Sequence, residues 1–175
     1  DVSFFKYFGY LEVLLGFVFY IYQLYLIFKT KVRKQKDIYY LYIVFAVISF
    51  ILALILSCFY FIYLNDYILS VAGFVFLIGF LSPMITAHLY KIVPFLVWFH
   101  RFSSLVGKQK VPMLADMVPL KSSNFGFSFY LIGFILSLIA FSLNSDILFK
   151  SAVSFLFIGT LFIVKDVFYI INFKG

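Results

Sequence analysis

Residues 38–65 read IYYLYIVFAVISFILALILSCFYFIYLN and contain no Asp, Glu, Lys or Arg. Residues 67–90 and 122–145 are also free of charge, and 13–28 and 151–164 form two shorter charge-free stretches. Each of the three long stretches exceeds the roughly 20 apolar residues that a helix needs to cross a bilayer core about 30 Å thick. The pattern predicts an all-α fold, a polytopic membrane helical bundle with five transmembrane spans.

The bases between these stretches predict the orientation of the spans. Twelve of the 14 bases lie on alternate connections, and only Lys6 and Lys150 lie on the other side. The twelve are Lys29, Lys31, Arg33, Lys34, Lys36, Lys91, Arg101, Lys108, Lys110, Lys121, Lys165 and Lys174. Basic connections are cytoplasmic by the positive-inside rule, so we expect the N-terminus outside and the C-terminus in the cytoplasm. The predicted location is the inner (cytoplasmic) membrane of a bacterium.

We expect one transmembrane domain over residues 1–175. Its predicted parts are spans at about 7–28, 38–64, 67–90, 125–143 and 147–163, an interfacial segment at about 91–103 and a cytoplasmic loop at about 103–124. The outer connections 65–66 and 144–146 consist of turn residues, which predicts that the spans on either side of each are antiparallel neighbours.

The third span holds the chain's unusual features. A single helix over residues 67–102 would be about 54 Å long, so it has to bend or leave the bilayer. Pro83 and Pro94 mark the expected interruptions, because each lacks the amide that closes a helical hydrogen bond. We expect a second helical piece beginning at Lys91. This basic amphipathic piece holds Trp98, the chain's only tryptophan, and belongs at the cytoplasmic interface.

Composition excludes several classes of function. With 65% hydrophobic residues, the chain falls outside the soluble globular class, and its net charge of +7 predicts contact with anionic lipid at the cytoplasmic loops and not with nucleic acid. The single cysteine, Cys58, excludes an intrachain disulfide. No zinc or iron–sulfur spacing, phosphate loop or nucleophile motif is present, so the chain is not expected to be catalytic alone.

Four residues are candidates for a site. His88 lies within the third span, where an ionisable residue is a functional candidate, and neutral imidazole is a common metal and haem-iron ligand. His100 is a weaker candidate for the cofactor, as is Met84, one turn before His88. Glu12, near the outer end of the first span, is a candidate for a proton path. The alternatives are structural: a histidine that donates to a carbonyl freed by a proline kink, a packed methionine and a solvated glutamate.

Two segments of the third span carry a family resemblance. Val71–Phe80, with the sequence VAGFVFLIGF, is followed by Ala87–Trp98, with the sequence AHLYKIVPFLVW. Together they resemble the tenth helix of subunit I in the haem–copper oxidase superfamily and its NnrS-type relatives. The family's haem-ligating His-x-His pair falls near Asp66 and Ile68 here, so those ligands do not carry over. The resemblance implies a similar bundle, of which these five spans would correspond to helices eight to twelve.

The sequence thus predicts an integral membrane subunit, or the C-terminal half, of a haem–copper-oxidase-like protein in or beside a respiratory electron-transfer complex. Haem is the implied cofactor, and other membrane subunits are the implied partners. Two alternatives stay open: a transporter or channel component in which the proline-broken span lines a substrate path, and a purely structural membrane subunit. An N-terminus outside, without a signal, fits either a reverse anchor or a chain that continues upstream of Asp1.

Overall fold

The computed structural model describes residues 2–30 and 37–173, and over these residues every regular element is a helix. The chain divides into two compact units, Asp1–Gln35 and Lys36–Gly175. The first unit contains α1 (Val2–Thr30), an apolar helix whose Lys29 ammonium lies 5.8 Å from the centre of the Tyr25 ring. The four bases predicted to follow the first span, Lys31, Arg33, Lys34 and Lys36, lie outside the described residues.

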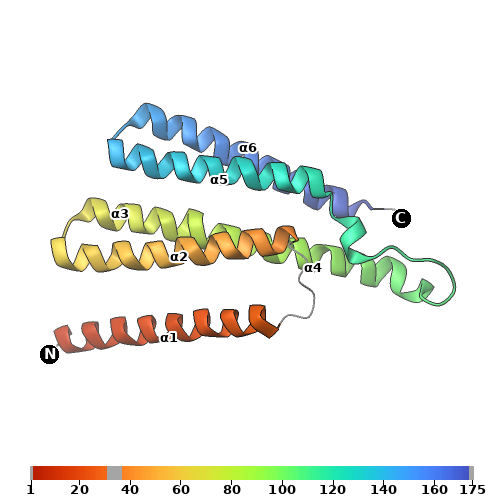
Figure 1. Cartoon of the computed structure of the whole chain (residues 1–175), viewed down its shortest axis with the longest axis horizontal. Coiled ribbons are helices and arrows are strands. Elements are labelled where there is room, and N and C mark those ends of the chain that lie inside the picture. The colour runs from red at the N-terminus through yellow and green to blue at the C-terminus, as the bar shows by residue number, and fades with distance from the viewer. Residues whose placement is uncertain (1, 31–36, 174–175) are drawn as a thin grey trace. The chain divides into compact units, whose positions relative to one another are not determined.

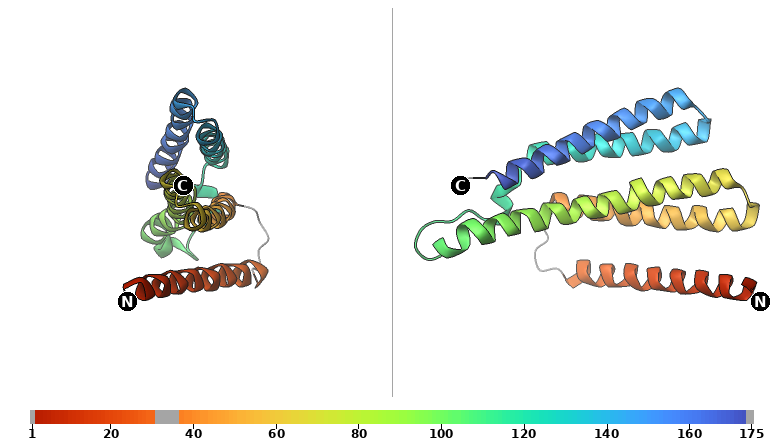
Figure 2. Two further views of the ribbon diagram at one scale, coloured as in Figure 1. Left: turned by 90° about the vertical axis from the view of Figure 1, so that its left-hand side faces the viewer. Right: turned by 180° about the vertical axis from the view of Figure 1, so that it is seen from behind.

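The second unit is built from two helical hairpins (Figure 1). In the first, α2 (Ile38–Tyr63) lies against a long helical run made of α3 (Asp66–Phe74), the π-helical segment η1 (Val75–Leu81) and α4 (Ser82–Phe102). In the second, α5 (Leu120–Leu143) lies against α6 (Asp146–Ile171). Both hairpins are antiparallel, as the short outer turns predicted, and α4 joins them by packing on α6 (Figure 2).

Both outer turns are built in the same way. A residue in the left-handed conformation ends each first helix, Leu64 (φ 48°) after α2 and Asn144 (φ 49°) after α5. The next residue then caps the following helix: Asn65 accepts a hydrogen bond from the Tyr67 amide, and Ser145 accepts one from the Leu148 amide. A left-handed end followed at once by a polar N-cap reverses the chain within two residues.

The long helical run changes register immediately before Pro83. In η1 the amide of Ser82 bonds to the carbonyl of Leu77, five residues back. Pro83 would pair with Ile78 in that register, but proline has no amide hydrogen to donate. The hydroxyl of Tyr130 from α5 takes its place and donates to the Ile78 carbonyl at 2.8 Å. The polar group that proline leaves unpaired is therefore satisfied from a neighbouring helix.

The expected division of this span at Lys91 is wrong. α4 continues as one helix from Ser82 to Phe102, through Lys91 and the buried Pro94. Residues 66–105 form one apolar helical run of 40 residues, which is about 60 Å at 1.5 Å per residue. A run of that length exceeds the bilayer core by about a factor of two. The chain continues beyond Lys91 by prolonging the helix and not by starting a separate piece.

Three glycines bring α5 and α6 close together. A Cβ added at Gly133 would lie 2.7 Å from the Leu156 backbone nitrogen, and one at Gly159 would lie 2.8 Å from the Tyr130 backbone nitrogen. Gly126 meets the Phe162 Cβ at 2.9 Å in the same way. Small residues permit such close backbone approach between membrane helices. Gly126, Gly133 and Ser137 of α5 are buried, whereas Ser128 is exposed.

Residues 103–119 connect α4 to α5 and fold back onto α4. The segment contains two short 3₁₀ helices, η2 (Ser103–Leu105) and η3 (Leu114–Met117), so the predicted loop of 103–124 ends earlier, where α5 begins at Leu120. The indole nitrogen of Trp98 donates to the Pro112 carbonyl at 3.0 Å, and Met117 is completely buried. The tryptophan expected at an interface therefore fastens the connection to its own helix.

Four helical stretches of the described residues are long and apolar enough to cross a membrane: 38–60, 66–105, 120–143 and 146–171. Residues 11–27 of α1 form a shorter apolar stretch. Several helices are longer than the spans predicted from charge. α6 continues through Lys165 and Asp166 to Ile171, because the charged atoms of both residues have neighbours within the fold: Lys165 lies over the Phe162 ring, and Asp166 accepts a hydrogen bond.

Candidate functional site

A buried carboxyl group lies where three helices of the second unit meet. Asp166 of α6 is 0% exposed, and its Oδ2 accepts a 2.7 Å hydrogen bond from the hydroxyl of Tyr90 in α4. Its other oxygen, Oδ1, is buried and has no hydrogen-bond partner. Buried polar groups are almost always paired, and an intramembrane carboxyl is costly to keep. Asp166 is therefore the polar residue of the described fold whose burial calls for a functional explanation.

Tyr42 of α2 completes this cluster. Its ring stacks on that of Tyr90, with centroids 6.0 Å apart and an interplanar angle of 20°. The residue is 0% exposed, and its hydroxyl oxygen has no hydrogen-bond partner. Its ring is held in the core between those of Tyr90 and Phe127. We call Asp166, Tyr90 and Tyr42 the acid cluster.

The acid cluster was not predicted from the sequence. One signal was available: Asp166 is an isolated carboxyl next to a long apolar stretch. The fifth span is predicted to end at about residue 163, whereas α6 continues for five residues past Asp166. Nothing in the sequence marks Tyr42 or Tyr90 among the chain's 14 tyrosines. Their pairing with Asp166 depends on helix packing between residues 76 or more positions apart.

His88 lies on the exposed surface of α4, away from the acid cluster. Its Nδ1 donates to the carbonyl of Met84 at 2.8 Å, because a carbonyl can only accept. The ring meets that of Tyr39 edge-on at a centroid distance of 5.9 Å. With Nδ1 carrying the hydrogen, Nε2 of the neutral imidazole is a free lone-pair donor, which is the arrangement that metal-bound histidines use.

His100 repeats this local geometry three turns further on. Its Nδ1 donates to the Leu96 carbonyl at 2.8 Å, and it is also exposed. Neither histidine bonds to a carbonyl that a proline frees, because Pro83 frees Ile78 in the π register and Pro94 frees Tyr90, four residues before it. The structural role considered for the histidines, pairing with a carbonyl at a proline kink, is therefore wrong.

The other two candidates are Met84 and Glu12. Met84 is half-buried, and its backbone carbonyl is the acceptor for His88. Glu12 lies on the exposed surface of α1, in the first unit. Within the described residues no three His, Cys, Asp or Glu side chains gather in a group that could hold a metal ion. The fold places Met84 and His88 one turn apart on α4, His100 about three turns further along the same helix, and Glu12 in the first unit.

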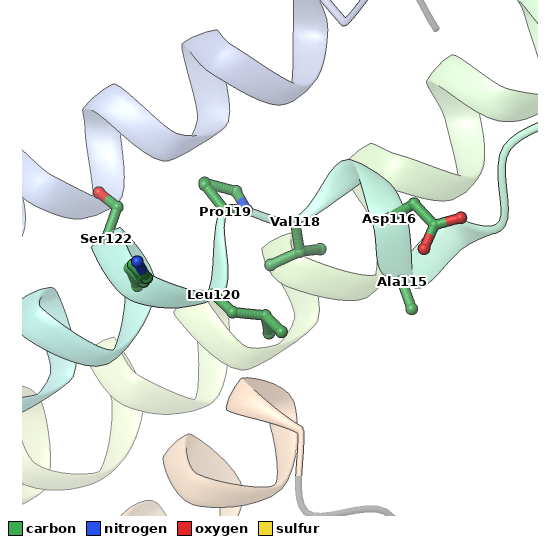
Figure 3. Close-up of a pocket in the computed structure, with 7 residues that line it drawn as sticks. Ala115, Asp116, Val118, Pro119, Leu120 and Ser122 are labelled. Carbon is green, nitrogen blue, oxygen red and sulfur yellow. The ribbon is translucent and has the colours of Figure 1, made fainter.

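An open pocket lies at the start of α5 (Figure 3). It is lined by Ala115, Asp116, Val118, Pro119, Leu120, Lys121 and Ser122. None of these residues belongs to the acid cluster or to the predicted site. The pocket is a feature of the folded connection between α4 and α5, and the candidate chemistry lies elsewhere.

The predicted site residues fit haem in one respect only, the imidazole ligand. His88 could supply one imidazole ligand to a haem iron, because it is exposed and its Nδ1 is already bonded to a carbonyl. Since His88 is exposed, a macrocycle bound here would need a second chain to cover it. No family model, curated protein or solved structure matches this chain. Over the described residues the structure defines an all-helical chain with four helical stretches that are long and apolar enough to cross a membrane.

Proposed function

We infer that the chain is an integral membrane subunit, or the C-terminal half, of a haem–copper-oxidase-like protein in or beside a respiratory electron-transfer complex. The observation that carries this proposal is the exposed imidazole of His88, whose Nδ1 is already bonded to the Met84 carbonyl. An ionisable residue in a membrane helix needs a partner, and an imidazole whose other nitrogen is already bonded is suited to an iron ligand. The resemblance of residues 71–80 and 87–98 to the tenth helix of that family supports the same proposal.

The proposal includes an arrangement in the membrane. α1 and the four longer apolar stretches make five spans, with the N-terminus outside and the C-terminus in the cytoplasm of a bacterial inner membrane. The outer turns at 65–66 and 144–146 carry few charges, whereas the connections at 31–36 and 103–119 are basic. Other membrane subunits cover the His88 surface, and anionic lipid contacts the basic connections. We expect the chain to purify in a larger assembly.

Substitution of the two histidines tests the role of His88. His88→Gln and His100→Gln remove the same local hydrogen bond, from Nδ1 to the carbonyl four residues earlier, and both positions are exposed. The purified host complex should show a haem Soret band that is lost or shifted in His88→Gln and is unchanged in His100→Gln. Since the two sites match locally, a difference between the variants reports the iron ligand and not helix stability.

Two results would overturn the proposal. An intact assembly without a Soret band would favour a transporter, a channel component or a structural subunit. Equal spectra in wild type and His88→Gln would show that any haem in the complex is held by other residues.

A further inference from the structure

The proposed function gives no role to the acid cluster, in which two buried oxygen atoms have no hydrogen-bond partner. Asp166 Oδ2 has one donor, Tyr90, and Oδ1 has none, while the Tyr42 hydroxyl beside them is also unpartnered. An ionised carboxylate offers about four acceptor positions and is stable in a buried place only when donors or a cation fill them. A protonated carboxyl needs less, and its hydroxyl is itself a donor.

The described bases of α4 and the last turns of α6 each have another neighbour. On α4, Lys91 pairs with Asp37 at 2.5 Å, and Arg101 donates to the Phe173 carbonyl at 2.6 Å. On α6 itself, Lys165 lies 5.6 Å from the centre of the Phe162 ring. Within the described part of the chain, Asp166 therefore has no ion-pair partner.

The remaining groups that face the acid cluster are neutral. On α5, the Tyr130 hydroxyl is taken by the Ile78 carbonyl, and Lys121 is exposed. α2 contributes Tyr42, and α4 contributes Tyr90. Within the described residues, the groups that interact with Asp166 are the phenols of Tyr90 and Tyr42, and neither carries a positive charge to compensate an ionised carboxylate.

We propose that Asp166 is a proton-binding site, in which Oδ1 carries a proton while Oδ2 accepts from Tyr90. The equilibrium is Asp–COO⁻ + H⁺ ⇌ Asp–COOH, and it needs no other reactant. The protonated site holds α6 against α4 through the 2.7 Å bond from Tyr90, whose ring stacks on that of Tyr42 in α2. Loss of the proton leaves a buried charge with one donor, so α6 has to shift.

The location suits exchange with the basic side of the membrane. Asp166 is five residues from the end of α6 at Ile171, about 8 Å along the helix axis. Lys91, the neighbour of Tyr90 in sequence, is exposed and forms its ion pair with Asp37 at the beginning of α2. The acid cluster thus lies a short distance inside the end of the bundle that carries the bases.

Infrared spectroscopy of the whole chain tests this proposal without a variant. A protonated carboxyl has a C=O stretching band that ionised carboxylates lack. At neutral pH the wild-type chain should show this band, and incorporation of ¹³C-carboxyl aspartate should shift it, which separates Asp166 from Glu12. The described aspartates other than Asp166 are Asp37, which is paired with Lys91, and the exposed Asp66, Asp116 and Asp146.

Three variants locate the proton. Asp166→Asn keeps the acceptor for Tyr90 and should abolish the band, whereas Glu12→Gln should leave the isotope-sensitive band unchanged. Tyr90→Phe removes the donor to Oδ2, so the band should remain and move to higher frequency. An aspartate band absent at neutral pH in the wild type, or one that persists in Asp166→Asn, overturns the proposal. A band that disappears on addition of Na⁺ at constant pH would also overturn it, by showing a metal-cation site.

Discussion

The hydroxyl of Tyr130 in α5 donates to the backbone carbonyl of Ile78, 52 residues earlier in the chain, at 2.8 Å. Ile78 is the residue that Pro83 would have paired with in the π register, so one phenol replaces one missing amide. The π segment packs closely around this bond, because a Cβ added at Gly79 would lie 2.7 Å from both Ser49 and Phe134. Register change, proline and tyrosine thus form one structural unit that joins the two hairpins.

Tyr130→Phe should destabilise this unit. It leaves a carbonyl without a donor inside the bundle, which costs about 1–3 kcal/mol. Thermal unfolding of the purified chain in detergent, followed by helical circular dichroism, measures the change. Tyr67→Phe is the matched control, since Tyr67 also donates to a backbone carbonyl, that of Phe141, but in an exposed position where water replaces it. Equal effects of the two substitutions would contradict the role given to Tyr130.

Enlarging Gly159 should separate α5 from α6. A side chain there meets the backbone of Tyr130, which cannot move without displacing the helix, so Gly159→Leu should cost about 1–3 kcal/mol or more in the free energy of unfolding. Gly73→Ala is the control: nothing lies within 4 Å of its added Cβ, and alanine favours the helix by about 0.5–1 kcal/mol. The measurement is a detergent unfolding series, and a destabilised Gly73→Ala with a neutral Gly159→Leu would refute this packing.

Trp98→Phe should release the connection between α4 and α5. The substitution keeps an aromatic ring and removes the indole hydrogen that bonds to the Pro112 carbonyl. Trypsin should then cut after Lys108 and Lys110 faster than in the wild type, because proteases need a segment that can leave its packed position. Phe95→Leu, which changes an exposed ring on the same helix, serves as the control. Unchanged cleavage rates in Trp98→Phe would show that the bond does not hold the segment.

Single cysteines at Lys108 and at Ser145 should react with an impermeant thiol reagent from opposite sides of the membrane. The two positions flank α5, a 24-residue helix of about 36 Å, which is long enough to span the bilayer core. Cys58 has to be replaced by Ser first, because it is exposed on α2. Labelling of both positions from one side would remove the proposed topology, and with it the helix-by-helix correspondence to the oxidase-like fold.

Much of the fold could be read from the order of charges and turn residues. The charge-free stretch 38–65 predicted α2 nearly to its ends, and the outer turns predicted both antiparallel hairpins. The ends of α6 were harder to predict, because a lysine and an aspartate normally end an apolar span. Here Phe162 and Tyr90 provide neighbours for them, and those contacts depend on neighbouring turns and helices.

The sequence by itself determined that the chain is helical and apolar, because a run of 20 or more uncharged residues is a local property that any bilayer would select. It also marked His88 as unusual. Only the tertiary structure decided which polar atoms are buried and paired. Tyr130 meets Ile78, and Tyr90 meets Asp166, through helix packing that places residues 52 and 76 positions apart within hydrogen-bond distance. Such contacts leave no local pattern, since each depends on the rotation of two helices about their own axes.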